Sequence, residues 1–416
     1  MKKIFVIVLG AMLFWACSSI PMEERRYNVK LADYLYAVEY EDYNFDECKA
    51  YFDSKYIPAG GCSEVRRGDF VGRNLDWYIN GNASAVIKID HNDKHFASIG
   101  MVGCFPEFSN AVAEPGQYND VYKYLPLKTE DGINEYGLYV GINVMPTGET
   151  SFDVDTWEPH KYGHGAAHTK PGATTYAVNY LPRVLLDRAK NVDEAMKLID
   201  SIDWTEPMNY PHQDETQAFH FFICDNTRSV VLEFMDNKAV YTEAESITEP
   251  GFGTIMTNFT NALWAKDIWQ INGIGYERFE ILRDNYKNYG YYPDDARGMQ
   301  ALMSQVWFTK TYTNPIDSED IWLTEFSSDD LPSSYLYRNY ALVKVPELRQ
   351  RIEDERQLFR DKTDWFTDRT SLWFTTHTSV YDMTDGTLYV MVHEGLNGQS
   401  SFMEIPFNSL FPLPLK

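Results

Sequence analysis

Gly61-Cys62-Ser63, followed by Gly72-Arg73-Asn74-Leu75-Asp76-Trp77, is the stretch of this chain that says most about its fold. An arginine eleven residues after a cysteine and an aspartate fourteen residues after it do not have the spacing of metal ligands. A papain-type cysteine would need a distant histidine partner. The stretch fits an N-terminal nucleophile, in which the thiol attacks and the α-amine of the same cysteine acts as the base once the preceding chain is removed.

Arg73 and Asp76 then have natural roles beside Cys62. The positive charge of Arg73 favours the thiolate, and Asp76 is suited to hold the α-amine through a charge-assisted hydrogen bond. The competing interpretation is that Gly72-Arg73-Asn74 is an ordinary turn at the end of a strand. As it stands, the segment from Cys62 to Asp76 resembles the choloylglycine hydrolase and penicillin V acylase family, the linear-amide hydrolases of the N-terminal-nucleophile (Ntn) class.

Three later residues extend the resemblance, in the order that the family has them. Asn143 ends Gly141-Ile142-Asn143 and is similar to the family's oxyanion-hole asparagine. Asn258 lies in Ile255-Met256-Thr257-Asn258-Phe259, which looks like an apolar strand ending in Thr-Asn, and Arg278 matches the late arginine of the active site. Taken singly, each asparagine would more often be a turn or cap residue. The short separation of Asn258 and Arg278 is more like the acid ceramidase and isopenicillin N acyltransferase relatives than the bile salt hydrolases.

The resemblance implies an α+β fold, the four-layer αββα sandwich of the Ntn hydrolases with two packed antiparallel sheets. The residue patterns agree, because strands, then helices, then further strands are typical of a layered α+β architecture. We expect a helix over 180–202 and another that begins near Tyr276. Strands are expected within 69–72, 83–89, 96–102, 138–143 and 220–234, and again between Leu372 and Phe402.

The N-terminus predicts export. Met1-Lys2-Lys3 and the apolar run to Ala16 indicate a signal peptide over 1–16, too short for a stable membrane span. The following Cys17 resembles the lipidated cysteine of bacterial lipoproteins, although Trp15 is bulky for such a site. We therefore expect a periplasmic or outer-membrane-anchored protein, with plain secretion as the alternative.

Residues 17–61 are interpreted as the lipoprotein N-terminus and a propeptide, and residues 62–416 as the Ntn hydrolase catalytic domain. Apolar residues between Asn28 and Tyr56 recur at roughly helical spacing and predict two short helices. Pro58-Ala59-Gly60-Gly61 then gives a flexible junction directly before the nucleophile.

The composition of the chain limits the kinds of partner that we expect it to bind. The net charge of −24 argues against nucleic acid, whose phosphates need a basic surface. The same negative charge disfavours binding to an anionic membrane surface, so we expect contact with a membrane only through a lipid anchor at Cys17. An odd count of 5 cysteines in an exported chain points to a functional thiol. At most one disulfide is expected, and Cys48 is a candidate to link the propeptide to the main chain. Cys104 and Cys224 lie in apolar runs and are interpreted as buried side chains.

Two further patterns have a structural and a functional interpretation. His160, His164 and His168 have helical spacing, but the glycines and proline around them favour a loop that lines the substrate entrance over a zinc site. The aromatic run 286–292 is more typical of a packed surface loop than of a ring-stacking site.

Together these features predict an exported cysteine Ntn hydrolase without cofactor or metal. It would cleave the linear amide bond of an N-acylated small molecule, of the bile salt, penicillin V or fatty acyl amide type, through a thioester at Cys62. An acyltransferase that uses the same acyl-enzyme is one alternative. A non-catalytic surface lipoprotein that binds glycans through its aromatic residues is the other. Both a monomer and a homo-oligomer remain open.

Overall fold

The structure of the chain is a computed structural model. It describes residues 29–32, 35–40, 43–52, 61–79, 84–103, 124–145, 151–153, 159–160, 165–166, 168–205, 218–246, 248–266, 268–270, 276–307, 372–392 and 402–406.

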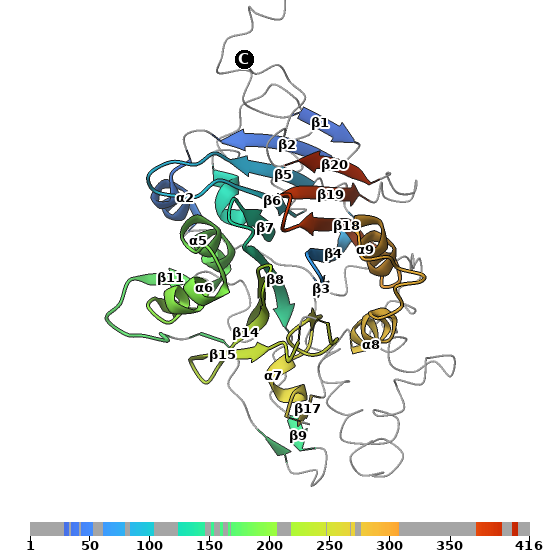
Figure 1. Cartoon of the computed structure of the whole chain (residues 1–416). Helices are drawn as coiled ribbons and strands as arrows, with labels where there is room; N and C mark the ends of the chain where they lie inside the picture. Colours follow the sequence, from blue (N-terminus) through green and yellow to red (C-terminus); the bar gives the residue numbers. More distant parts are fainter. Residues whose placement is uncertain are drawn as a thin grey trace, which may run out of the picture.

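Two large sheets form the centre of the molecule (Figure 1). In the described residues the larger has nine strands, in the order β1 (Val29–Ala32), β2 (Leu35–Tyr40), β5 (Ser84–Ile89), β6 (Ser98–Val102), β7 (Asp131–Asn134), β8 (Tyr139–Met145), β13 (Ala218–Cys224), β14 (Ser229–Met235) and β15 (Lys238–Glu243). The smaller has six strands, in the order β16 (Ile255–Met256), β3 (Gly61–Arg67), β4 (Phe70–Ile79), β18 (Leu372–Asp382), β19 (Thr387–Val392) and β20 (Met403–Pro406).

The two sheets pack face to face through alternate residues of their strands. In β13, Phe222 and Cys224 belong to the core between the sheets, whereas Phe221 and Ile223 belong to the core on the opposite face. The smaller sheet contributes inward-facing residues of β4, β18 and β19 to the shared core, including Tyr381. Successive side chains on a strand point to opposite faces, so each strand serves two layers.

Helices cover the outer face of each sheet. The nine-stranded sheet is covered by α5 (Leu181–Arg188), α6 (Val192–Ile199) and α2 (Phe45–Phe52), and the six-stranded sheet by α8 (Tyr276–Asn285) and α9 (Ala296–Ser304). Figure 1 shows the first group to the left of the sheets, and α8 and α9 to the right. The order helix, sheet, sheet, helix is the predicted αββα sandwich. The sheets are antiparallel apart from the parallel pair of β2 and β5.

The predicted single helix over 180–202 is wrong in one respect, because it is broken into α5 and α6. Ala189 leaves the helical conformation, with φ −113° and ψ 138°. Asn191 then begins α6 as its N-cap, and its side chain accepts a hydrogen bond from the Glu194 backbone N–H at 2.9 Å. The predicted helix near Tyr276 is confirmed by α8, and the predicted strands fall within β4, β5, β6, β8, β13, β14, β18 and β19.

The prediction of two short helices between Asn28 and Tyr56 is wrong. The segment forms β1 and β2, and then the single helix α2. Leu35, Ala37 and Val38 of β2 are fully buried, since one face of the strand packs between the sheets and the other under the helices. The apolar residues therefore mark a strand that is buried on both faces, a pattern that periodicity does not distinguish from a buried helix.

The remaining described elements are short. They are the 3-10 helices η1 (Leu125–Lys128) and η2 (Val178–Tyr180), the helix α7 (Asn261–Trp264), a small sheet of β10 (Pro159–His160), β9 (Ser151–Asp153) and β17 (Ile268–Gln270), and the pair of β11 (Thr175–Ala177) and β12 (Asp203–Thr205).

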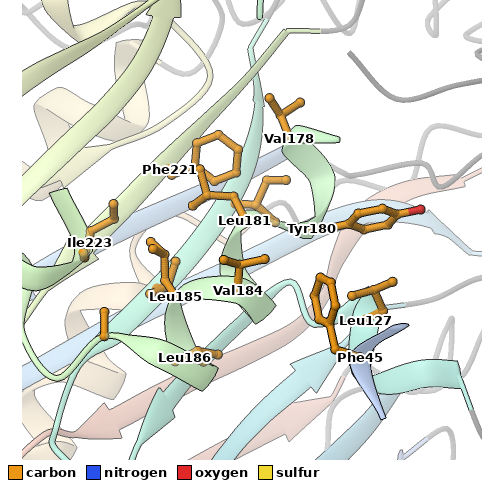
Figure 2. Close-up of a cluster of buried hydrophobic side chains, with 14 of the residues drawn as sticks. Phe45, Leu127, Val178, Tyr180, Leu181, Val184, Leu185, Leu186, Phe221 and Ile223 are labelled. Atoms are coloured by element: carbon orange, nitrogen blue, oxygen red, sulfur yellow. The ribbon is translucent and has the colours of Figure 1, made fainter. Parts of the chain in front are cut away.

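Replacing Leu185 by Ala should test the outer core of the nine-stranded sheet. Leu185 is fully buried on α5 against residues of β13, as Figure 2 shows. Because a large cavity would form, we expect a loss of about 2–5 kcal/mol in the free energy of unfolding, measured by urea denaturation. Leu198→Ala, on the half-buried side of α6, is the matched control and should cost about 1 kcal/mol. Equal losses in both variants would contradict this packing.

Candidate active site

The β3–β4 hairpin places the first three predicted site residues together. In the hairpin register Gly61 pairs with Asp76, Cys62 with Leu75, and Glu64 with Arg73. The hairpin turns at Gly68, whose φ of +58° is readily adopted by glycine. The spacing of Cys62, Arg73 and Asp76 in the sequence is therefore the spacing of one tight hairpin.

Arg73 contacts the sulfur of Cys62. Its Nη2 lies 3.1 Å from Cys62 Sγ and also donates to the backbone oxygen of Ile142 in β8 at 2.8 Å. Both Cys62 and Arg73 are fully buried between the sheets. Burial raises the pKa of the Cys62 thiol, and the Arg73 charge acts against that rise. Arg73 is thus the group that most favours the thiolate here.

The backbone nitrogen of Cys62 is held by a second set of residues. Cys62 N–H donates to Asn258 Oδ1 at 2.9 Å, and the same oxygen accepts from Arg278 Nη2 at 2.8 Å. Arg278 Nη1 donates to Asp76 Oδ2 at 2.5 Å, and Thr375 Oγ1 donates to Asp76 Oδ1 at 2.6 Å. Burial raises the pKa of Asp76, and Arg278 acts in the opposite direction. Asp76, Asn258 and Arg278 therefore form one connected network at this nitrogen.

Asn258 is fixed on its other side as well. Its Nδ2 donates to the Val144 backbone oxygen of β8 at 2.5 Å. The turn that carries Asn258 leads into α7, whose first two backbone N–H groups, those of Asn261 and Ala262, both donate to the buried Glu233 carboxylate at 2.7 Å. His220 lies 3.3 Å from the same carboxylate. These contacts tie the Asn258 turn to the nine-stranded sheet.

Asn143 does not join the network at the nitrogen. It lies within β8, two residues before its end, and is fully buried. The orientation of its amide follows from its neighbours, which are acceptors: Nδ2 donates to Glu64 Oε1 at 2.8 Å and to the Ile142 backbone oxygen at 2.9 Å. The structure therefore places the predicted oxyanion residue beside Glu64.

A group of buried acidic residues surrounds Arg73 and was not anticipated from the sequence. Arg73 Nη1 pairs with Asp131 and lies 3.8 Å from Glu130, and Arg73 Nε lies 3.3 Å from Glu64 Oε1. Burial raises the pKa of Glu64 to about 8 and that of Glu130 to about 7. Tyr381 and Ser379 also donate to Asp131. One signal for Glu64 was present, since residues two apart on a strand share a face and Glu64 follows Cys62 by two.

The histidines of the predicted entrance loop are only partly described. His160 lies in β10 and its side chain is outside the described residues, as is the whole of His164. His168 is 63% exposed and its Nδ1 lies 2.8 Å from Asp203. Within the described residues, no group of three or more histidine, cysteine, aspartate or glutamate side chains has the geometry of a metal site.

The described cysteines form no disulfide: Cys48, Cys62 and Cys224 are all buried as thiols. Cys48 belongs to the core under α5, and Cys224 to the core between the sheets. Cys17 and Cys104 lie outside the described residues.

The aromatic run 286–292 combines buried and exposed residues. Tyr286 and Tyr292 are buried in the core under α8 and α9, as a packed loop requires. Tyr289 and Tyr291 are exposed, and the Arg67 guanidinium lies 5.1 Å from the centre of the Tyr289 ring.

No helix in the described part of the chain combines the length and the apolarity needed to cross a membrane.

Comparison with known proteins gives one family and several structures. Residues 64–260 match the model of the family described as acyl-coenzyme A:6-aminopenicillanic acid acyl-transferase. This match confirms the resemblance to the acylases and acyltransferases of the Ntn class. No curated protein matches the chain.

Among solved structures, two of conjugated bile acid hydrolase from Clostridium perfringens are 14% and 13% identical to this chain, each with a TM-score of 0.48. Each match covers 83% of this chain, and 92% and 93% of the respective hydrolase chains. Penicillin V acylase from Agrobacterium tumefaciens is 14% identical, with a TM-score of 0.42, and the match covers 84% of this chain and 86% of that one.

Proposed function

We propose that this protein is a cysteine amidohydrolase of the Ntn class, which cleaves the linear amide bond of an N-acylated small molecule. The observation that carries the proposal is that both reactive atoms of one residue are held by separate groups. The Cys62 sulfur contacts Arg73, and the Cys62 nitrogen donates to an asparagine that is itself held by Arg278. An N-terminal nucleophile needs this arrangement, because its nitrogen is the base for its own sulfur.

The proposed reaction starts from a Cys62 whose α-amine is free. The amine takes the thiol proton and the thiolate attacks the amide carbonyl, while Arg73 stabilises the negative charge on sulfur. The tetrahedral intermediate collapses to a thioester as the leaving amine takes a proton from the Cys62 ammonium group. An α-amine has a pKa of roughly 8 when unperturbed, which suits both transfers near neutral pH. Water then hydrolyses the thioester and releases the acid.

Asn258 and Asn143 are the proposed polar groups for the oxyanion, together with a backbone N–H. In the uncut chain both side-chain amides donate to other groups, Asn258 to Val144 and Asn143 to Glu64 and Ile142. We propose that Asn258 has the larger effect on the reaction, because it also holds the nitrogen that serves as base.

The substrate is proposed to be an acyl amide of the bile salt, penicillin V or fatty acyl type. Acyl transfer to an amine is the second candidate, and it is favoured by the family that residues 64–260 match. We also propose that the protein is exported and attached to a membrane through a lipid at Cys17.

A panel of amides tests the proposal and separates the two candidates. Conjugated bile salts, penicillin V, N-acyl homoserine lactones and fatty acyl amides would be incubated with purified protein, with and without added hydroxylamine. A hydrolase releases free acid and amine at its full rate without hydroxylamine, which can only divert part of the thioester to the hydroxamate. An acyltransferase releases little free acid until the amine acceptor is present. Amine release by a Cys62→Ala variant at the wild-type rate would contradict the assignment of the nucleophile.

Asn258→Ala should lower kcat by roughly a hundredfold or more and change KM much less, because oxyanion stabilisation is needed mainly in the transition state. The matched control is Asn179→Ala, a buried asparagine of η2 under the opposite face of the sheet, which should leave both constants near their wild-type values. A change confined to KM in Asn258→Ala would assign the residue to substrate binding instead.

A further inference from the structure

Glu64 contacts three residues that approach it from two different strands. Its Oε2 accepts a hydrogen bond from the Tyr139 hydroxyl at 3.0 Å, and its Oε1 accepts one from Asn143 Nδ2 at 2.8 Å. Oε1 also lies 3.3 Å from Arg73 Nε, an ion pair rather than an aligned hydrogen bond. The carboxylate is fully buried. Because Glu64 belongs to β3 and its partners to β4 and β8, it lies where the two sheets meet.

The neighbouring strand leaves space for this carboxylate. Gly141 in β8 faces Glu64, and a Cβ atom at Gly141 would clash with both of its oxygens. A carboxylate is costly to bury, so it is found in such a place only when its oxygens are paired. Each oxygen of Glu64 has at least one partner.

The contacts of Arg73 show why the position of Glu64 matters. A guanidinium group is planar, and its orientation is most tightly fixed when all three of its nitrogens face acceptors. Asp131 holds Nη1, the Ile142 backbone oxygen holds Nη2, and Glu64 faces Nε. In this orientation Nη2 is also directed at Cys62 Sγ. With Glu64 in place, each of the three nitrogens of Arg73 faces an acceptor, whereas without it Nε would face none of these groups and the guanidinium could shift about its other two contacts.

We propose that Glu64 is a positioning residue, which sets the plane of Arg73 against the Cys62 sulfur and holds Asn143 in the same arrangement. The proposal rests on the proposed function of Cys62 and adds to it a residue that the resemblance did not assign. Glu64 acts through the place of its oxygen atoms. A glutamine can present an oxygen to Arg73 and Asn143 and an amide N–H to Tyr139, whereas a leucine of similar size can do neither.

The charges around the sulfur determine what a substitution at Glu64 does to the thiol. The titratable and charged groups that face this region are Arg73 and Asp76 from β4, Glu64 from β3, Glu130 and Asp131 before and in β7, Tyr139 from β8, and Tyr381 from β18. The negative charge of Glu64 raises the pKa of the thiol, and the Arg73 contact lowers it. Both substitutions remove the first effect, since neither glutamine nor leucine is charged. Glu64→Gln keeps the second effect, whereas Glu64→Leu weakens it.

The experiment compares Glu64→Gln and Glu64→Leu with the wild-type protein. The rate of Cys62 modification by iodoacetamide would be followed by peptide mass spectrometry between about pH 6 and pH 10, and the midpoint of each profile compared. Because Cys62 is fully buried, each profile is normalised to its own rate at the highest pH, so that the midpoints are compared and not the accessibility of the thiol. We expect the midpoint of Glu64→Gln to lie below that of the wild type, and the midpoint of Glu64→Leu to lie above that of Glu64→Gln by about one pH unit.

Turnover is the second measurement, on the amide of the panel that the wild type cleaves fastest. Glu64→Gln should retain kcat within a few-fold, and Glu64→Leu should lose it by about tenfold or more at similar KM. A residue with only a structural role would give parallel losses in both variants and midpoints that do not separate. Wild-type kcat in Glu64→Leu would also overturn the proposal.

If Glu64→Leu does not fold, the Tyr139→Phe variant tests the proposal in its place. It removes one hydrogen bond from the carboxylate and should raise the midpoint and lower kcat in smaller measure, and wild-type values would overturn the proposal. The alkylation profiles need neither chain cleavage nor a substrate. A protein that cleaves no amide would therefore contradict the proposed function, while the separation between the midpoints of the two Glu64 variants would still test the role of Glu64.

Discussion

N-terminal sequencing of the purified, active protein is expected to begin at Cys62, and Cys62→Ala is expected to remain a single chain without activity. In the uncut chain the Cys62 nitrogen is an amide that donates to Asn258. An amide nitrogen is no base, so the reaction requires that the bond to Gly61 be broken. Signal peptidase acting near Cys17 cannot do this. We expect the Cys62 thiol to attack the Gly61 carbonyl and give a thioester that water opens, because Gly61 carries no side chain to obstruct it.

The effect of Cys62→Ala on turnover should be complete, since both the nucleophile and the maturation step are lost. Cys224→Ala is the matched control, because Cys224 is equally buried between the sheets but belongs to β13 and does not touch Arg73 in the described structure. It should be cut and remain active. An active enzyme with an intact bond between Gly61 and Cys62 would rule out the Ntn mechanism.

Arg73→Ala should lower kcat by roughly a thousandfold, the upper part of the range for loss of one electrostatic contact to a developing charge. Its Nη2 is the cationic group at the Cys62 sulfur, and burial otherwise disfavours the thiolate. Arg73→Lys keeps the charge but loses the planar fork, so it should retain more activity than Ala and less than the wild type. Turnover near the wild-type value in Arg73→Ala would remove the arginine from the mechanism.

The stability of the Arg73→Ala variant should depend on pH, so its activity has to be measured at a pH where it is folded. Beside Arg73, which lowers both values, burial raises the pKa of Glu64 to about 8 and that of Glu130 to about 7, and without the arginine both pKa values should rise further. A carboxyl with a raised pKa binds more protons in the folded than in the unfolded state, so stability falls as pH rises from the unfolded pKa, roughly 4, through the folded one. The thermal midpoint of the variant is therefore expected to be higher at about pH 6 than at about pH 9, and activity should be compared where it is folded.

The sequence predicts the parts of the site that lie on one hairpin. Cys62, Arg73 and Asp76 follow each other at a fixed spacing, because β3 and β4 pair across a tight turn. The resemblance pointed to Asn258 and Arg278, and the structure brings Asn258 to the Cys62 nitrogen and Arg278 to the same Asn258 oxygen. The positions of Asn258 and Arg278 beside Cys62 could not be predicted from the local sequence pattern, because the three residues meet only through tertiary packing.

The residues that were missed are those whose role depends on the facing sheet. Asp131 begins a four-residue strand, and nothing in that short stretch indicates that it meets Arg73 across the interior. The wrong prediction of two helices in the N-terminal segment has a related cause. β2 is buried on both faces by elements far along the chain, so its apolar residues have no alternation that would mark a strand.

The parallel pairing of β2 with β5 changes the molecularity of folding. β2 precedes Cys62 in the chain and β5 follows it, so a cut before Cys62 makes their six paired positions, Leu35 to Tyr40 with Ser84 to Ile89, a contact between two polypeptides. The buried side chains of β2 would keep the short polypeptide in place after the cut. Once the two chains separate on heating, however, reassembly becomes second order, and the midpoint of unfolding rises with protein concentration. Folding before cutting is thus the route by which a single polypeptide reaches this sheet without having to find a partner.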